Sequence, residues 1–203
     1  MKAVVGIDVG GSTTKIVGFD ISDDKRILLK PVTVKATDPV ASVYGAFGKF
    51  TSENGVDIKD IKRVMLTGVG STYIGDNIFG VPTLHVDEFT AVGRGGLYLS
   101  KLSEAVIVSM GTGTALVYAK SGTEPEYLGG TGVGGGTLIG LSKKALRMEN
   151  VRQIEELAAD GNLEGVNTEL CRVAADVQNC PRCVDQRLPA QRRLGIVLTA
   201  GVG

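Results

Sequence analysis

The stretch AVVGIDVGGSTTKIVGFD, residues 3–20, decides the fold that this sequence predicts. Residues 3–8 form an apolar run that ends in the carboxylate Asp8, and residues 15–20 form a second run. The residues between them include two glycines followed by three hydroxyl-bearing side chains. Short apolar runs separated by a glycine turn are typical of two paired strands. The stretch therefore predicts a β-hairpin with glycines and hydroxyls at its tip.

The same arrangement occurs again about 100 residues further along the chain. Residues 105–110 predict a buried strand, Gly111-Thr112-Gly113 a turn, and residues 114–119 a return strand. Two such hairpins facing each other across a cleft would hold a nucleotide from both sides, because backbone N–H groups at glycine turns bind anions. The repeat therefore predicts two similar structural units.

Hydrophobic periodicity predicts the remaining elements. Strands are expected at residues 27–36, 63–67, 83–86 and 124–128, and helices at 39–53, 88–100, 137–147 and 151–160. Asp87 is placed to cap the helix 88–100. Three strands, then alternating helices and strands, and then a second hairpin predict an α/β fold with a mixed sheet and helices on its faces.

The composition excludes several classes of protein. The 203 residues fit one domain or two small ones, and 22 basic and 22 acidic side chains give no net charge. Such a chain lacks the broad attraction that nucleic-acid or membrane-surface binders use, so neither partner is expected. One histidine rules out a multi-histidine metal centre. Without an apolar run of about 18 residues or a signal-peptide pattern after Met1, we expect a cytoplasmic protein.

The first hairpin tip has the chemistry of an anion site. Its glycines let backbone N–H groups approach a phosphate closely, and the hydroxyls of residues 12–14 add donors. Lys15 adds a positive charge, and Asp8 is able to hold a hydrated magnesium ion beside a polyphosphate. The pattern differs from a P-loop, because Ser12 stands where the lysine of that motif belongs. The alternative is a glycine-rich hairpin with a solvated aspartate.

A run of glycines at residues 129–136 leads into the helix expected at 137–147. Backbone N–H groups and the helix dipole favour phosphate at such a position. A flexible linker is the alternative, but the run contains Val133 and lacks the serines or charges that are common in linkers. We therefore expect this run to line the same nucleotide cleft.

Asp87 and Glu88 stand at the start of the helix 88–100, directly after a short predicted strand. A carboxylate at that place is able to act as a general base. It is equally able to cap the helix or to interact with the helix dipole. The residues alone leave both interpretations open.

The sequence changes character after about residue 167. All twelve lysines lie before residue 145, and the three cysteines lie at 171, 180 and 183. One CxxC pair plus a third cysteine is a weak zinc signal, because zinc takes four ligands. We expect residues 167–203 to form an irregular tail, and three interpretations are open: a genuine irregular segment, a disordered one, or one translated in a shifted reading frame, which the abrupt change favours.

Four segments together resemble the type II pantothenate kinases, which belong to the superfamily of acetate kinase, sugar kinases, Hsp70 and actin. The segments are Gly6–Lys15, Val86–Phe89, Val108–Thr114 and Gly129–Thr137, in that order within residues 1–166. The resemblance implies an actin-like, ribonuclease H-like lobe (βββαβα, mixed sheet) at residues 1–103 and the start of a second such lobe at 104–166. The kinases of this family continue well beyond that point, so the chain resembles a truncated member.

The resemblance implies ATP-dependent phosphorylation of pantothenate to 4′-phosphopantothenate, the first step of coenzyme A biosynthesis. Glu88 matches the catalytic glutamate that accepts the proton of the pantothenate hydroxyl, and Asp8 would hold Mg²⁺ through water. Tyr127 stands where relatives often carry an arginine that contacts the substrate carboxylate, so it is the expected substrate-binding residue. The residues expected to bind the ATP phosphates are Asp8, Gly10, Gly11, Ser12, Thr13, Thr14, Lys15, Gly111, Thr112, Gly113, Thr114, Gly134, Gly135, Gly136 and Thr137.

Two alternative functions stay open. Activator ATPases of 2-hydroxyacyl-CoA dehydratases carry similar hairpin tips, but they also use cysteines for an iron–sulfur cluster. A truncated chain is also compatible with an inactive nucleotide-binding remnant, and we expect it to expose apolar surface that the missing part should cover. Relatives in the kinase family are dimers, which makes a homodimer one option for this chain.

Overall fold

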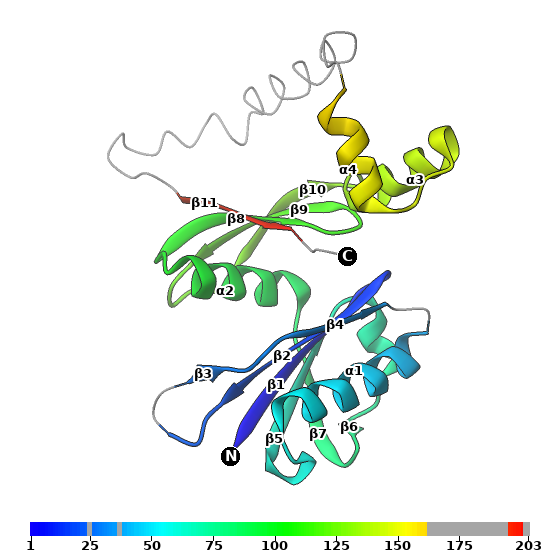
Figure 1. Cartoon of the computed structure of the whole chain (residues 1–203). Helices are drawn as coiled ribbons and strands as arrows, with labels where there is room; N and C mark the ends of the chain where they lie inside the picture. The colour runs from blue at the N-terminus through cyan, green and yellow to red at the C-terminus, as the bar shows by residue number, and fades with distance from the viewer. Residues whose placement is uncertain (24–25, 36–37, 162–194, 201–203) are drawn as a thin grey trace.

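The computed structural model describes residues 1–23, 26–35, 38–161 and 195–200, which form two β-sheets with helices on their faces (Figure 1). The first sheet contains β1 (Ala3–Val9), β2 (Thr13–Asp20), β3 (Ile27–Leu28), β4 (Val32–Lys35), β5 (Ile61–Thr67), β6 (Asn77–Ile78) and β7 (Val81–His85). The second contains β8 (Glu104–Met110), β9 (Thr114–Lys120), β10 (Glu126–Thr131) and β11 (Gly195–Ala200). The predicted α/β fold class is confirmed.

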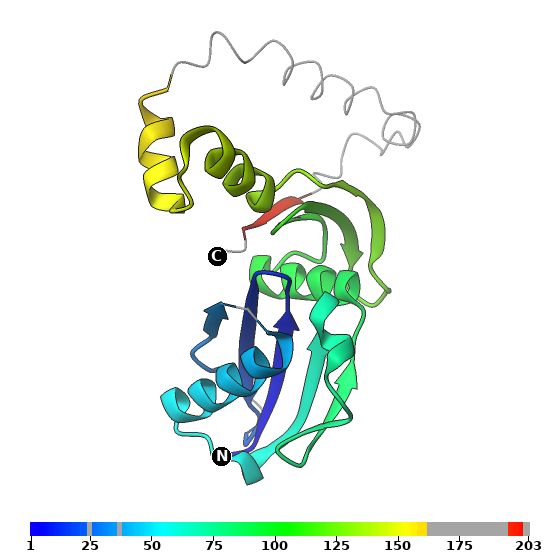
Figure 2. The same ribbon diagram turned by 90° about the vertical axis from the view of Figure 1, so that its right-hand side faces the viewer.

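The helices are α1 (Pro39–Asn54), α2 (Glu88–Ser100), α3 (Gly135–Leu146) and α4 (Val151–Ala159), and two short 3-10 helices lie at η1 (Ile58–Asp60) and η2 (Val69–Tyr73). Helix α2 lies between the two sheets (Figure 2). None of the helices in the described ranges is both long and apolar enough to cross a membrane.

Both predicted hairpins are present. Strands β1 and β2 pair antiparallel, and β8 and β9 repeat this pairing in the second sheet. In the first sheet β1, β5 and β7 run parallel and lie next to one another. Because parallel strands end at the same edge of a sheet, the segments after these three strands are brought together.

One face of the first sheet packs on α1 and forms the main core. Alternate residues of β1, among them Ile7 and Val9, are buried together with Phe47 and Phe50 of α1. A Cβ atom at Gly18 on β2 would lie 2.5 Å from the Phe50 ring, so the close packing of α1 depends on this glycine. The opposite face of β1 carries Asp8, because successive side chains of a strand point to opposite faces.

Helix α2 packs on the second sheet. Gly96 leaves no room for a side chain, because a Cβ there would overlap with Ile107 of β8. A Cβ at Gly93 would likewise lie 2.6 Å from Pro125. Ala105, Ile107 and Ala119 form the small core of this unit. Toward the first sheet, the Tyr98 ring of α2 meets Phe19 of β2 edge to face at 5.4 Å between ring centroids. The division of the chain at residue 103 stays a prediction. Helix α2 ends just before this residue and contacts both units.

Three local expectations differ from the structure. The strand expected at 27–36 is divided into β3 and β4 around Pro31, which has no N–H group to donate to a sheet. The strand expected at 124–128 is shifted to Glu126–Thr131. The third helix starts at Gly135 rather than at residue 137, since the helix includes two glycines of the preceding run.

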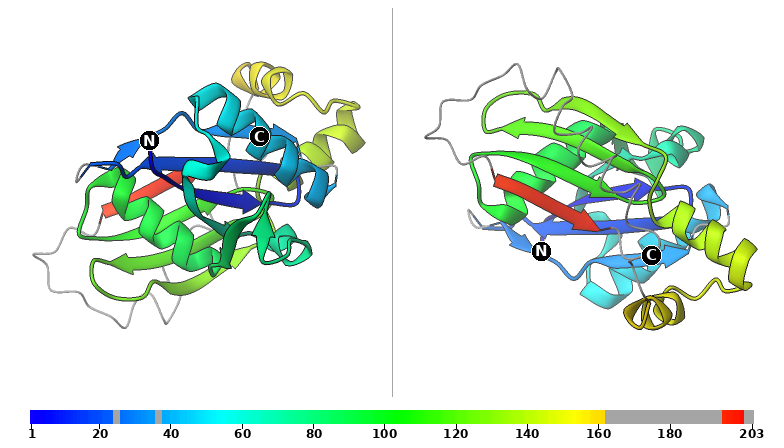
Figure 3. Two further views of the ribbon diagram at one scale, coloured as in Figure 1. Left: turned by 90° about the horizontal axis from the view of Figure 1, so that it is seen from below. Right: turned by 90° about the horizontal axis from the view of Figure 1, so that it is seen from above.

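Strand β11 lies within the segment expected to be an irregular tail. It pairs in parallel with β8 along all six of its residues, from Gly195 with Ala105 to Ala200 with Met110 (Figure 3). For these six residues the expectation of irregular chain is therefore wrong, since the partner edge of β8 supplies the order that a local pattern does not. The three cysteines at 171, 180 and 183 lie outside the described residues.

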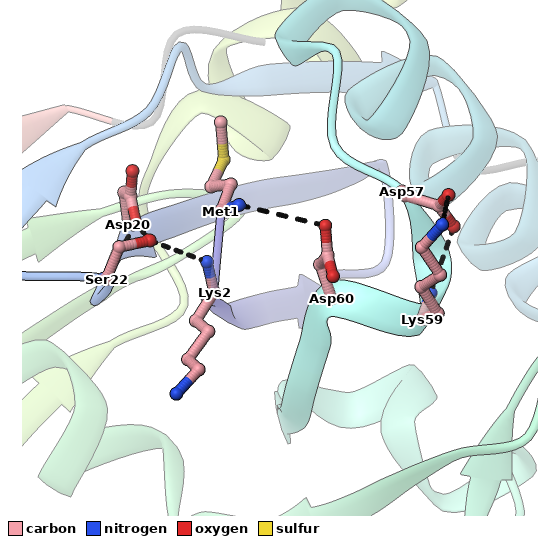
Figure 4. A network of polar contacts seen from close by, with 7 residues as sticks. All are labelled: Met1, Lys2, Asp20, Ser22, Asp57, Lys59 and Asp60. Atoms are coloured by element: carbon pink, nitrogen blue, oxygen red, sulfur yellow. Dashed lines mark hydrogen bonds and ion pairs between the residues drawn. The ribbon is translucent and has the colours of Figure 1, made fainter.

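Polar contacts hold the other end of the first sheet, where β1 begins (Figure 4). The amino group of Met1 lies 3.8 Å from Asp60, and the backbone N–H of Lys2 donates to the Ser22 hydroxyl at 2.8 Å. The Ser22 hydroxyl and backbone N–H both donate to Asp20, and these hydrogen bonds lower the pKa of its carboxyl group. This cluster lies at the opposite end of β1 from Asp8, so it serves the fold and not the site.

Candidate functional site

Carboxylates gather where the parallel strands of the first sheet end. Asp8 is the last residue but one of β1, and Glu88 follows β7 by three residues. The backbone N–H of Val86 donates to the carbonyl of Leu66 at 2.8 Å, which holds the segment after β7 against the end of β5. The arrangement therefore places Asp8 and Glu88 at one edge of the sheet.

Asp8 shares its face of the hairpin with Lys15. The two residues are directly opposite in the register of β1 and β2, and the Lys15 Nζ lies 3.5 Å from the Asp8 Oδ2. Both side chains are a little more than one third exposed, at 37% and 36%. The side chains expected to hold a cation and an anion are thus adjacent and open to solvent.

Gly68, the residue after β5, makes room for the Asp8 carboxylate. Its φ of +86° belongs to the left-handed region that favours glycine. A Cβ at this residue would lie 2.5 Å from the Asp8 Oδ1 and 2.7 Å from the Val9 carbonyl oxygen. Any side chain at residue 68 would therefore displace Asp8.

Asp87 and Glu88 have different roles. The Asp87 carboxylate caps α2 by accepting the Thr90 N–H at 2.9 Å, so the predicted cap is confirmed. Glu88 lies at the surface, yet surrounding protein atoms desolvate its carboxyl group and raise its pKa. The negative charges of Asp8 and Asp87 raise this pKa further, whereas Lys15 lowers it. Glu88 thus interacts electrostatically with the Asp8–Lys15 pair, and the capping role belongs to its neighbour.

The first hairpin tip is exposed at Gly11 and Ser12, and the Gly10 N–H donates to the Thr13 carbonyl at 3.0 Å. Thr13 and Lys15 share the face of Asp8. Thr14 does not, because it points into the α1 core and is 0% exposed. Its hydroxyl therefore lies on the wrong face of β2 to reach a phosphate, and this part of the predicted site is corrected.

The glycine run and the second tip bind each other. The N–H of Gly135 donates to the Gly111 carbonyl at 2.8 Å, and the N–H of Gly136 donates to the Thr112 carbonyl at 3.1 Å. A Cβ at Gly134 would lie 2.7 Å from the Thr112 carbonyl oxygen. The run is thus packed against the tip, which excludes the flexible-linker alternative.

These contacts change the role that we expected the glycine run to have in phosphate binding. The N–H groups of Gly135 and Gly136 are already used, and a hydrogen bond of 2.9 Å connects the Thr137 hydroxyl to the Gly132 carbonyl. The Thr114 hydroxyl likewise donates to the Val133 carbonyl at 2.8 Å. We therefore assign Gly134–Thr137 and Thr114 to shaping the second tip. The Gly111 N–H is used as well, since it donates to the Gly113 carbonyl at 2.8 Å, which leaves Thr112 and Gly113 as the tip's candidates for phosphate contact.

Tyr127 lies beside the first turn of α2. Its ring stacks on Phe89 with 4.2 Å between the centroids and 18° between the planes. Phe89 directly follows Glu88, and the Tyr127 side chain is 48% exposed. The predicted substrate-binding residue is thus next to the predicted general base, although its role in binding stays a prediction. Sequence analysis missed Phe89, whose stacking depends on contact between the two units.

The carboxylates fit a hydrated cation rather than a fully protein-bound one. No group of three histidine, cysteine, aspartate or glutamate side chains arranged to hold a metal occurs among the described residues. A single accessible carboxylate suits Mg²⁺, which keeps several waters and binds through one or two carboxylates and the substrate phosphates. Asp8 is therefore compatible with the predicted role.

A hollow of about 680 Å³ opens at the far end of α2, and it is separate from these residues. Its lining includes Arg94, Tyr98, Lys101 and Glu124. The guanidinium of Arg94 pairs with Glu124, and the ammonium of Lys101 lies 3.9 Å from the Tyr98 ring centroid. Since these cations already have partners and the hollow contains none of the predicted site residues, it is not the candidate site.

Curated relatives support the resemblance seen in the sequence. A type II pantothenate kinase of Bacillus cereus is 29% identical over 177 residues, which are 80% of this chain and 56% of the relative. A type II pantothenate kinase of Staphylococcus aureus is 27% identical over 179 residues, or 86% of this chain and 61% of the relative. The chain thus spans less than two thirds of the length of these relatives.

The fold is also that of a solved structure. The chain superimposes on the (R)-2-hydroxyglutaryl-CoA dehydratase component A of Acidaminococcus fermentans with a TM-score of 0.66 and 15% identity, over 100% of this chain and 84% of the other. The BadF/BadG/BcrA/BcrD ATPase family matches residues 5–184, beyond residue 166 at which we ended the resemblance. The chain belongs to the BadF/BadG/BcrA/BcrD ATPase family.

Proposed function

We propose that this chain is the nucleotide-binding part of a kinase that transfers the γ-phosphoryl group of ATP to the hydroxyl of pantothenate. The products would be ADP and 4′-phosphopantothenate, the first intermediate toward coenzyme A. The observation that carries the proposal is that Asp8, Lys15 and Glu88 lie at the same edge of the first sheet, with Asp8 and Lys15 in contact and Glu88 after the end of β7. The relatives named type II pantothenate kinase support the choice of acceptor.

Each of the three side chains has a distinct task in this proposal. Lys15 and the exposed tip at residues 11–13 bind the terminal phosphates through charge and backbone donors. Asp8 holds the hydrated Mg²⁺, which neutralises phosphate charge when bound. Glu88 accepts the proton of the acceptor hydroxyl as its oxygen attacks the γ-phosphorus and ADP leaves. The raised pKa of Glu88 makes it a better proton acceptor than an ordinary surface glutamate.

The acceptor would lie between Glu88 and the stacked pair of Phe89 and Tyr127. Tyr127 is half exposed and offers both a ring face and a hydroxyl group, so it suits contact with the amide and methyl groups of pantothenate. Such binding energy would hold the hydroxyl in line with the γ-phosphate, and positioning of this kind supplies most of the catalysis in phosphoryl transfer.

The test is incubation of the chain with ATP, MgCl₂ and pantothenate, followed by mass spectrometry for 4′-phosphopantothenate. We expect this product together with an equal amount of ADP, formed much more slowly than by a full-length relative. ADP release that is independent of pantothenate, with no phosphorylated acceptor, would contradict the kinase proposal.

That contrary result would favour an activator ATPase of the 2-hydroxyacyl-CoA dehydratase type. The superposition on component A over the whole chain is the observation that supports this second candidate. An iron–sulfur absorbance band in the anaerobically purified chain would support it further. Nucleotide binding without any ADP release would instead favour the inactive remnant.

A further inference from the structure

Thr67, to which sequence analysis assigned no role, lies beside Asp8. Strands β1 and β5 run parallel with Asp8 paired to Thr67, one step after the pair Ile7 and Leu66. Ile7 and Leu66 are both buried in the core under α1. Since side chains alternate between faces, Thr67 and Asp8 both project from the opposite face, which also carries Lys15.

The position of β5 makes Thr67 central to the site. In the sheet β5 lies between β1, which carries Asp8, and β7, which leads to Glu88. Thr67 is the last residue of β5, and the left-handed Gly68 follows it against the Asp8 Oδ1. The Thr67–Gly68 segment therefore separates the two carboxylates.

The Thr67 hydroxyl is buried and unpaired. In the part of the chain that the structure describes, its Oγ1 is closed to solvent and has no hydrogen-bond partner. A buried polar group without a partner is unfavourable and rare in native proteins. The Thr14 hydroxyl is also buried and unpaired, but it lies on the core face, whereas Thr67 lies on the face of the site, where a change at Asp8 is able to supply a partner.

The Asp8 carboxylate is the acceptor that such a change offers. Because solvent does not reach the Thr67 Oγ1, its partner is expected to be a protein atom. The Asp8 carboxylate now lies 3.5 Å from Lys15, and that lysine is required on the phosphates when a nucleotide binds. Its departure leaves the carboxylate without its ion-pair partner, at the register position next to Thr67.

We propose that Thr67 is a positioning residue whose hydroxyl donates a hydrogen bond to Asp8 once Lys15 has moved onto the nucleotide phosphates and a hydrated Mg²⁺ has taken its place beside Asp8. The hydrogen bond holds the carboxylate toward the hydrated cation, so Thr67 acts through Asp8 and touches neither nucleotide nor acceptor. This inference rests on the proposed nucleotide site, but it is independent of the acceptor.

The test compares Thr67→Val and Thr67→Ser in the full chain. Isothermal titration measures the affinity for the non-hydrolysable ATP analogue AMP-PNP, once in EDTA and once in MgCl₂. Thr67→Val should reduce the gain in affinity caused by Mg²⁺ by about tenfold, the loss expected for one hydrogen bond to a charged group. Its affinity in EDTA should be unchanged, and Thr67→Ser should restore the gain. The Tm of nucleotide-free Thr67→Val should not fall, because the lost hydroxyl has no partner in that state.

Thr83→Val is the matched control on the neighbouring strand β7. The Thr83 hydroxyl is buried but donates to the Gly75 carbonyl at 2.8 Å, so this variant should have a lower Tm and an unchanged gain from Mg²⁺. The role of Thr67 would be overturned if Mg²⁺ raised the AMP-PNP affinity of Thr67→Val as much as that of the wild type. It would also be overturned if the Tm of Thr67→Val fell as much as that of Thr83→Val. Absence of AMP-PNP binding by the wild type would overturn this role and the proposed nucleotide site together. Mg²⁺-dependent binding that is sensitive to Thr67, without phosphorylation of pantothenate, would contradict the proposed function alone.

Discussion

The Nζ of Lys15 lies 3.5 Å from the Oδ2 of Asp8, across the first hairpin from it. The pair is partly open to solvent, so the attraction between the two charges is screened and modest. A triphosphate carries several negative charges and competes well for the lysine. In the proposed function, the pair is therefore the state of the site before a nucleotide and its cation separate the two side chains.

Replacing Lys15 should weaken nucleotide binding. We expect Lys15→Met to bind AMP-PNP about tenfold more weakly, because one charge-assisted contact to phosphate is lost. Isothermal titration in MgCl₂ measures this change. Lys49→Met on α1 removes a lysine that pairs with Glu53, far from the hairpin tip, and should bind normally. Equal affinities of the two variants would exclude Lys15 from the phosphate site.

The activity should depend on the ionisation of Glu88. Burial and the charges of Asp8 and Asp87 raise its pKa above 4.5, and the base is the deprotonated form, so turnover should fall as the pH drops through this raised pKa. Removing a negative neighbour makes deprotonation easier, so Asp8→Asn should move the acid limb of the pH profile of kcat/KM, which reports the free enzyme, to lower pH. Lys15→Met should move it to higher pH. Shifts of the opposite sign in initial rates well below saturation would contradict the assignment of Glu88 as the base.

The same raised pKa has a consequence for stability. A carboxyl group whose pKa is higher in the folded than in the unfolded chain favours folding at low pH, and this contribution is lost as the pH rises through the folded pKa. At neutral pH the charged Glu88 therefore opposes folding, so Glu88→Gln should have a Tm at pH 7 that is equal to or above that of the wild type. Thermal unfolding at pH 7 and at pH 4 checks this, since the difference between the two proteins should shrink at pH 4.

The strands, turns and most helix limits could be predicted because they depend on local pattern. Helix α2 begins and ends where the spacing of its apolar residues and the Asp87 cap place it. Strand β11 could not be found in this way, because its order comes from pairing with β8, about 90 residues earlier in the chain. The site residues divide in the same way: some are marked by the local sequence, and others depend on contacts between distant segments.

Asp8, Lys15 and Glu88 carry charges at strand and helix ends, and the sequence marks them directly. Thr67 does not stand out in this way, because its importance depends on the register between β1 and β5. The expectation that the N–H groups of Gly135 and Gly136 donate to phosphate failed for a similar reason. Their N–H groups bind the second tip, and a glycine run does not reveal its hydrogen-bond partners. The phosphate contact expected of the Thr14 hydroxyl was avoidable, since alternation with Lys15 already places the two side chains on opposite faces of β2.

The packing of the glycine run on the second tip predicts two opposite effects of alanine. Gly134→Ala places a Cβ 2.7 Å from backbone atoms of Thr112 and Gly113, so the tip must move, and we expect a loss of about 1–3 kcal/mol in the free energy of unfolding. Gly140→Ala in α3 meets no atom within 4 Å and should stabilise the chain by about 1 kcal/mol, because alanine favours a helix. Urea unfolding of both variants measures the difference. A stable Gly134→Ala would contradict the close packing of run and tip.

The central claim is that Asp8, Lys15 and Glu88 form a phosphoryl-transfer site in which Glu88 is the base. The most direct measurement compares turnover and nucleotide affinity of Glu88→Gln with those of the wild type, with Glu124→Gln at the far end of α2 as the matched control. We predict that Glu88→Gln binds AMP-PNP as the wild type does but forms 4′-phosphopantothenate about 100-fold more slowly or worse, the usual effect of removing a general base. Glu124→Gln should retain full turnover. Wild-type turnover in Glu88→Gln would contradict the account.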